Sequence, residues 1–176
     1  MTVWLISANG STYDHAGAFN KWGYVDWKQS ANYAVGDTIY IYATSPDKRL
    51  RFKTVVEKIN MSFEESQDDT EFWKVDKPVN NKYARLKLVQ SIDSSRLSLE
   101  SLYENGLKQA AQGAMKLNGN LLAYIEKELK NGDINVPMKP LRVYDEGGVI
   151  HYVCPTCEFA FKEASRCPEC GQKVEI

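Results

Sequence analysis

The sequence predicts an α+β protein, built on a small curved sheet or barrel and followed by a small metal-binding module. Three observations predict this class: several short strand-like segments come early, two helical patterns come late, and two C-P-x-C motifs stand near the end. A chain of 176 residues can bury a core without covalent cross-links. We expect a main domain over 1–140 and a separate module over 141–176.

Four segments of the main domain have the composition or the alternation of strands. β-Branched and aromatic residues favour strands, and Gly, Asn, Ser and Pro clusters break them. Trp4 lies inside the first segment and is assigned to the core. The expected strands are 2–8, 38–43, 50–60 and 83–92, and the intervening segment 9–34 is dense in aromatic side chains but has no clean periodicity.

Two helices are expected after these strands. Ser98 is a suitable N-cap residue, Ser101 stands three positions later, and an Asn-Gly pair would end this first helix. The second helix covers about 119–131, where apolar residues recur on one face and another Asn-Gly pair provides a stop.

The charges are unevenly distributed along the chain. The formal net charge is -1, which by itself argues against a nucleic-acid binder. By segment, however, it is +2 for residues 1–60, -4 for 61–80, +3 for 81–140 and -2 for 141–176. The acidic run 64–71 is typical of a solvated loop, which Trp73 would anchor, and the rest of the main domain is mildly basic.

The N-terminus has neither the basic start nor the apolar stretch of a signal peptide. No run approaches the ~18–20 apolar residues of a membrane span. We therefore expect a cytoplasmic protein that does not associate with a membrane, and we expect its four cysteines not to form disulfides.

The cysteines form the most specific motif in the chain. Cys154, Cys157, Cys167 and Cys170 make two C-P-x-C knuckles. Each tight turn directs two thiolates at one metal ion, so together they supply the four sulfurs of a tetrahedral structural zinc site. Iron would fit the same geometry.

We expect residues 148–153 and 173–176 to pair as strands and complete a zinc ribbon around this metal. His151 is expected at the surface, because four sulfurs already close the coordination shell. The segment is acidic, and four thiolates on one zinc add further negative charge. A stabilising role or contact with a protein partner is therefore favoured over phosphate binding.

The chain lacks the usual motifs of catalysis. Neither His15 nor His151 has the context of a Ser–His–Asp triad, and there is no G-x-S-x-G, P-loop or H-E-x-x-H motif. With the cysteines assigned to a metal, no nucleophilic thiol remains. We therefore expect a protein that is not an enzyme, although a two-carboxylate site stays open.

An ordered series of motifs runs through residues 1–131. It comprises Trp4-Leu-Ile-Ser-Ala-Asn9, Ala18-Phe-x-x-Trp-Gly23, Val25-Asp-Trp-Lys-Gln29, Val35-Gly-Asp-Thr38, Leu97-Ser-Leu-x-x-Leu102 and Gln112-Gly113. This order resembles the EVE domain family of the PUA-like superfamily, which also contains the YTH and ASCH domains. The later motifs resemble those of EVE-type modules fused to HNH endonucleases, which tend to have Pro after Gln-Gly, where this chain has Ala114.

The resemblance implies a pseudo-β-barrel with flanking helices and a pocket for a modified base flipped out of DNA, such as 5-methylcytosine or 5-hydroxymethylcytosine. Aromatic walls recover part of the stacking that a flipped base loses. The residues nominated for the base are Asn9, Tyr13, Trp22, Trp27, Gln29, Gln112 and Gly113, with Trp22 and Trp27 as the walls. Phosphate contacts are expected from Lys21, Lys28, Lys48, Arg49 and Arg51.

Four functional hypotheses follow. The main one is a non-catalytic reader of modified DNA that acts in phage defence or restriction. The others are an RNA-binding module that recognises a modified or unpaired base, a nuclease with a hidden carboxylate site, and a protein-interaction adaptor that acts through the zinc ribbon. Each tryptophan also has a simpler interpretation as a core residue, and each basic residue as a solubilising one.

Overall fold

The computed structural model describes residues 1–130, 139–144, 147, 150–154, 159–162, 165–169 and 173–175. The chain divides into two compact units, Met1–Ile125 and Glu126–Ile176. Within the described ranges, no helix is long and apolar enough to cross a lipid bilayer. The assignment of separate functions to 1–140 and 141–176 stays a prediction.

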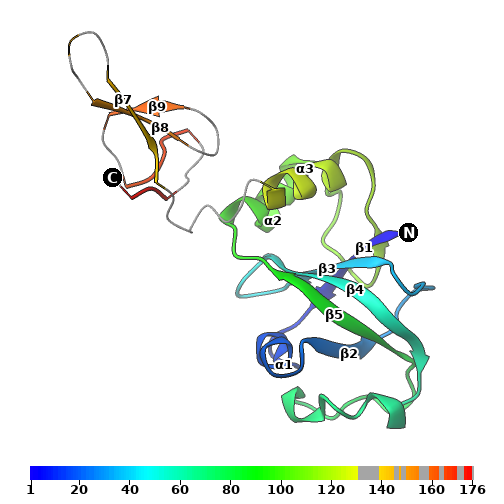
Figure 1. Cartoon of the computed structure of the whole chain (residues 1–176). Helices are drawn as coiled ribbons and strands as arrows, with labels where there is room; N and C mark the ends of the chain where they lie inside the picture. The colour runs from blue at the N-terminus through cyan, green and yellow to red at the C-terminus, as the bar shows by residue number, and fades with distance from the viewer. Residues whose placement is uncertain are drawn as a thin grey trace. The chain divides into compact units, whose positions relative to one another are not determined.

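A mixed six-stranded sheet forms the first unit, in the order β2-β5-β4-β3-β1-β6 (Figure 1). Its β1 and β3 strands run parallel, and every other neighbouring pair is antiparallel. The α+β class predicted from the sequence is confirmed. The strands are β1 (Val3–Ala8), β2 (Tyr24–Lys28), β3 (Thr38–Ala43), β4 (Arg49–Met61), β5 (Tyr83–Ser91) and β6 (Met115–Lys116).

Helices cover both faces of this sheet. One face packs against α1 (His15–Trp22), and the other lies beneath α2 (Leu99–Glu104) and the first turns of α3 (Gly119–Lys130) (Figure 1). Side chains of β1 pack in both layers, because successive side chains of a strand point to opposite faces of the sheet. Trp4 and Ile6 belong to the core on the α1 side, as expected for Trp4.

The expected helix boundaries agree with the structure, but one helix was not anticipated. Ser98 caps α2 by accepting a hydrogen bond from the Ser101 N–H at 3.3 Å. The unexpected helix is α1, whose eight residues include too few apolar positions to show a 3.6-residue period. Asp14 caps its start, and Gly23, at φ 72°, ends it in the left-handed conformation that glycine favours.

In the second unit, the described residues form a three-stranded sheet in the order β7-β8-β9. Its strands are β7 (Leu141–Tyr144), β8 (Ile150–Val153) and β9 (Ala160–Phe161). The predicted pairing of 148–153 with 173–176 is wrong for the described residues, because β7 and β9 occupy both edges of β8. Lys173 instead bridges to Arg166.

Candidate base-binding site

Four aromatic rings gather where β2 ends. The indoles of Trp27 and Trp73 are stacked, with centroids 5.6 Å apart and planes 18° from parallel. Tyr13 meets both indoles edge-on, at 5.4 and 5.2 Å, and the His15 ring lies 4.6 Å from Trp27. Such edge-on and stacked pairs are favourable arrangements for aromatic rings, so the two indoles are held in a fixed orientation.

A cavity of about 390 Å³ opens beside these indoles, and we call it the tryptophan pocket. Residues of both β1 and β2 line this cavity, although the two strands lie four positions apart in the sheet order. Across a flat sheet those strands would stand about 19 Å apart, so the sheet must curl strongly to bring them to one cavity. The lining residues are Ile6, Ser7, Thr12, Trp27, Lys28, Ser30, Trp73, Val75, Asp76, Pro78 and Gly113.

The acidic segment holds the aromatic cluster in place. Asp69, which is fully buried, accepts hydrogen bonds from the Tyr13 hydroxyl at 2.6 Å, the Asp26 N–H at 2.8 Å and the Lys77 ammonium at 3.0 Å. Lys77 also lies over the rings of Trp73 and Tyr83. The solvated loop expected for 64–71 is therefore wrong at Asp69, because the buried Lys77 neutralises its charge and two further donors satisfy its oxygens.

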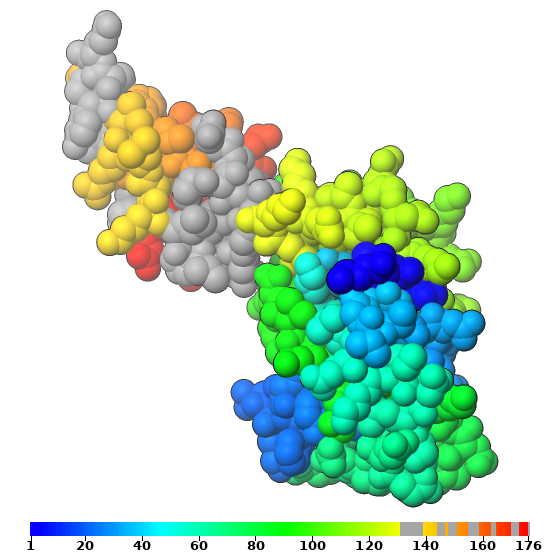
Figure 2. Space-filling model, turned by 45° about the vertical axis from the view of Figure 1, so that its right-hand side comes forward, coloured from blue at the N-terminus to red at the C-terminus, as the bar shows by residue number. Residues whose placement is uncertain are grey.

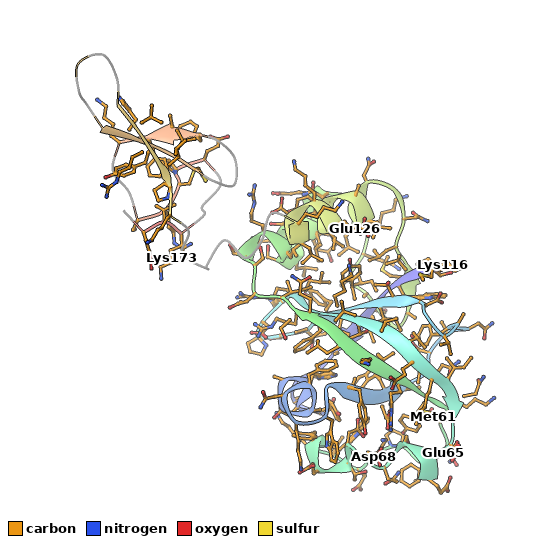
Figure 3. The ribbon with its side chains drawn as sticks, in the orientation of Figure 1. Met61, Glu65, Asp68, Lys116, Glu126 and Lys173 are labelled. Atoms are coloured by element: carbon orange, nitrogen blue, oxygen red, sulfur yellow. The ribbon has the colours of Figure 1, made fainter. Side chains whose placement is uncertain are left out.

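A second ion pair fastens the same segment to β2 and β5. Arg85 donates to both carboxylate oxygens of the buried Asp26, at 2.8 and 2.7 Å, and also to Asp68 at 2.8 Å. Figure 3 shows Asp68 on the segment that lies beyond the ends of these strands. The hydrogen bond to Asp26 raises the pKa of Arg85, and burial raises the pKa of Asp26 against the effect of Arg85.

Two buried ring nitrogens of the aromatic cluster have no hydrogen-bond partner among the described residues. They are Nε2 of His15 and Nε1 of Trp73. Burial lowers the pKa of His15 to about 4, so the imidazole is neutral at pH 7. Buried polar atoms without partners are uncommon, and each calls for a functional or solvent explanation.

The structure brings together some of the residues nominated for the base and separates the others. Trp27 and Gly113 line the tryptophan pocket, and Tyr13 lies behind its indoles. Trp22 is 41% exposed at the end of α1, beside Tyr24 and away from the pocket lining. The expected slot between Trp22 and Trp27 is therefore replaced by a cavity beside Trp27 and Trp73.

The nominated polar residues mostly serve the local fold. Asn9 accepts hydrogen bonds from the N–H and hydroxyl of Ser11 within its own turn. Gln29 accepts from the Asn60 N–H at 2.8 Å and donates to the Ala31 carbonyl. Gln112 is exposed next to Gly113. Their roles in reading a base edge stay predictions.

Three of the five nominated phosphate contacts already face carboxylates. Lys21 pairs with Glu71 at 2.5 Å, and both Arg49 and Arg51 lie within ion-pair distance of Asp93. Lys28 lines the tryptophan pocket, and Lys48 is an exposed residue with φ 48° in the β3–β4 turn. Lys28 is therefore the nominated cation best placed for a strand that enters the pocket.

Trp73 and His15 are the members of the cluster that sequence reasoning did not assign to the site. Trp73 follows the acidic run, where no periodicity marks a wall of a pocket. The only signal available was the aromatic content of the chain, which is 11%. His15 belongs to no recognisable motif in the sequence. Its ring neighbours are Tyr13, two positions earlier, and Trp27 on β2.

Two of the predicted metal ligands can be located. Cys154 and Cys167, one from each C-P-x-C motif, are buried in one small core with Tyr152, Phe161 and Val174. Cys157 and Cys170 lie outside the described residues. Among the described residues no group of three or more His, Cys, Asp or Glu side chains forms a metal site. Burial of one cysteine from each motif in one core fits the donor set of a shared zinc ion.

Comparisons with known proteins give matches in structure. No protein-family model matches the chain, and no curated protein matches it in sequence. The NMR structure of Rpa0253 from Rhodopseudomonas palustris is 10% identical over 70% of this chain and 89% of that one, with a TM-score of 0.51. The crystal structure of Atu2648 from Agrobacterium tumefaciens is 13% identical over 80% of this chain and all of that one, also with a TM-score of 0.51.

A crystal structure of an ASCH protein from Zymomonas mobilis is also similar, at 19% identity over 71% of this chain and 94% of that one, with a TM-score of 0.48. Identities this low concern the fold alone. The first unit shares its fold with Rpa0253 and Atu2648. The assignment to the PUA-like superfamily, and within it to the EVE family, belongs to the proposal below.

Proposed function

We propose that the PUA-like unit captures a single unstacked base of a nucleic-acid strand in the tryptophan pocket. The observation that carries this proposal is the stacked pair of indoles beside a cavity of about 390 Å³. That volume lies within the range of about 300–1,000 Å³ for small-molecule sites. Stacking on an aromatic side chain contributes about 1–3 kcal/mol per base.

The polar groups at the pocket suit the edge of a base. Ser7, Thr12 and Ser30 add hydroxyls to the lining, which also includes the charged Lys28 and Asp76 and the exposed Gly113. A base presents hydrogen-bond donors and acceptors on its edge and apolar surface on its faces, which matches this distribution. The resemblance to EVE domains supports a cytosine modified at carbon 5, in DNA, as the preferred base.

We infer that the unit reads the base without chemistry. The titratable side chains that line the pocket are Lys28 and Asp76, and both are exposed to solvent. The buried carboxylates nearby, Asp26 and Asp69, are already engaged with Arg85 and Lys77. A carboxylate held in a buried ion pair is a poor general base. Incubation of a modified strand with the protein and Mg²⁺ or Mn²⁺ should therefore yield no cleaved product.

Equilibrium binding tests the capture. We expect tighter binding to a DNA strand with one 5-methylcytosine or 5-hydroxymethylcytosine than to the same strand with cytosine. Trp73→Ala should weaken binding about 10- to 100-fold, which corresponds to the loss of one stacking contact. Trp22→Ala is the matched control, because Trp22 is exposed and lies outside the pocket.

A blocking variant keeps the test valid if Trp73→Ala does not fold. Val75 is half exposed and lines the pocket, so Val75→Trp should fill the cavity while leaving the core intact, and it should abolish binding. Equal affinity for modified and plain cytosine would refute base reading. Preference for RNA of the same sequence would assign the pocket to RNA instead.

We also propose that Cys154, Cys157, Cys167 and Cys170 bind one structural zinc ion in the second unit. The burial of Cys154 and Cys167 in one core supports this. A module with so small a core needs a metal for stability. When bound, zinc would tie the two knuckles together through its four thiolates.

An adaptor role for this second unit is the other candidate function. Leu141 and Val143 stand on the same face of β7 and are 67% and 41% exposed, and Phe159 is also 41% exposed. Exposed apolar side chains gathered in a small unit are typical of protein contact surfaces. Replacing Leu141 and Val143 with Ser should remove a co-purified partner and leave base binding by the first unit unchanged.

A further inference from the structure

The segment between α2 and α3 contains two lysines and no carboxylate. Residues 105–125 include Lys108 and Lys116 but neither Asp nor Glu. Among the described residues, no ion pair involves either lysine. The Lys116 ammonium lies over the Trp4 ring at 5.4 Å, which leaves its hydrogen-bond donors available. These cations differ from Lys21, Arg49 and Arg51, whose charges face carboxylates.

Both lysines line a second cavity, of about 430 Å³, which we call the lysine groove. Its other polar side chains, Gln109 and Asn118, carry amide donors, and none of its lining residues is acidic. Figure 3 shows Lys116 at the outer edge of the sheet, beside β1. A concave surface that carries two cations and no acidic side chain favours an anionic ligand.

The lysine groove and the tryptophan pocket are joined by one pair of strands. Gly113 lines the pocket, and three residues later Lys116 lines the groove, a distance of about 10 Å in extended chain. The neighbouring strand β1 also runs from one cavity to the other, because Ser7 lines the pocket and Trp4 pairs with Lys116 at the groove. In Figure 2 the start of the chain, in dark blue, lies directly beside the lime-green segment on the visible surface.

We propose that the lysine groove binds the phosphate backbone of the nucleic-acid strand whose base occupies the tryptophan pocket. The inference rests on the proposed function of that pocket. The two cavities are separated by the length of a few nucleotides at most, so one strand reaches both. The ligand is accordingly a base within a polynucleotide, and its neighbouring phosphates lie along β6. Lys108 and Lys116 hold these phosphates by charge, without reading sequence.

Salt dependence measures this contact. Each phosphate that a lysine neutralises on a single strand adds about 0.7 to the slope of log affinity against log salt concentration. The probe is a single DNA strand of about 12 nucleotides with one central 5-hydroxymethylcytosine, titrated between 50 and 200 mM NaCl. Replacing Lys108 and Lys116 with Gln should lower the slope by about 1.4 and weaken binding at least tenfold at 50 mM. The ratio of affinities for modified and plain strands should stay unchanged.

A matched control removes two other exposed lysines from the same unit. Lys58→Gln with Lys87→Gln makes the same change in net charge at positions on β4 and β5, and it should leave the slope unchanged. The free modified nucleoside has no phosphate. It should therefore bind the wild-type protein and the lysine-groove variant (Lys108→Gln with Lys116→Gln) with equal affinity. An unchanged slope in the lysine-groove variant, or an equal loss in the control, would overturn the proposal.

The outcomes for groove and pocket remain distinguishable. If the wild-type protein binds modified and plain strands with equal affinity, the proposed function fails. The salt slope measured with a plain strand still tests whether Lys108 and Lys116 bind phosphates. If polyglutamate of matched charge displaces the strand as effectively as DNA does, the groove binds acidic polymers in general, and the assignment to a nucleic-acid backbone is wrong.

Discussion

Asp69 should be the most sensitive single position of the first unit outside its apolar core. Its carboxylate is fully buried and bonds to Tyr13, Asp26 and Lys77. Asp69→Asn conserves the shape of the side chain, removes its charge and replaces one acceptor oxygen with an NH2 donor. The Lys77 side chain, which is 2% exposed, then stays in the interior with neutral oxygens such as the Ser66 carbonyl and with no anionic partner among the described residues.

The size of the effect follows from this burial. Breaking a buried ion pair by removing one partner costs about 3–5 kcal/mol, because the other charge stays desolvated. At about 4 °C per kcal/mol for a unit of this size, the melting temperature should fall by about 12–20 °C. Tyr13 and Lys77 both contact the indole of Trp73, so base binding should weaken as well.

Thermal unfolding followed by tryptophan fluorescence measures the loss. Asp68→Asn is the matched control, because that carboxylate is 53% exposed, and exposed pairs contribute only about 0–1 kcal/mol. Adding Lys77→Met to Asp69→Asn should restore at least half of the lost stability, since it removes the unpaired charge. Equal melting temperatures for the Asp68 and Asp69 variants, or no recovery in the double variant, would refute this account of the network.

Three further predictions concern titration, metal and capping. Because burial lowers the pKa of His15 from 6.5 to about 4, its contribution to stability is complete above pH 6.5 and is lost as the pH falls toward 4. Urea unfolding should show about 2–3 kcal/mol less stability at pH 4.5 than at pH 7, and His15→Phe should reduce this difference. Metal analysis should find one zinc ion per chain, and Cys167→Ser should abolish it without shifting the fluorescence-detected melting of the first unit, which contains all four tryptophans. Ser98→Ala should destabilise the first unit by about 1 kcal/mol in urea through loss of the α2 cap, whereas Ser95→Ala, at an exposed position, should have little effect.

The strands that sequence reasoning predicted well are those rich in β-branched and aromatic residues or with clear alternation. Residues 38–43 were expected and observed with identical bounds as β3, whose Ile39 and Ile41 fill the core on the α1 side. By contrast, α1 and β2 are short elements in a segment crowded with aromatic residues. Their positions depend on long-range partners, such as the β5 residues that pair with β2, and such partners leave no local period in the sequence.

The site was predicted in part for the same reason. Trp27 and Gly113 could be nominated because they belong to motifs of the EVE resemblance. Trp73 could not, because its place beside Trp27 depends on the acidic segment folding back over β2. That fold is directed by Asp69, whose partners Tyr13 and Asp26 lie 56 and 43 positions earlier in the chain. From the local sequence alone, residues 64–71 are indistinguishable from a run of solvated acidic side chains.

These pairings change what the charge count means for nucleic-acid binding. The acids of residues 61–80 do not simply offset the basic residues elsewhere, because they engage particular ones: Lys21, Lys77 and Arg85. Those cations serve the fold and are not available to a phosphate. The formal net charge is therefore a poor guide to nucleic-acid binding. The relevant cations are those that line a cavity and have no carboxylate beside them. By that criterion Lys108 and Lys116 are better candidates than the arginines of β4, and their substitution is the sharper test of how a strand approaches the pocket.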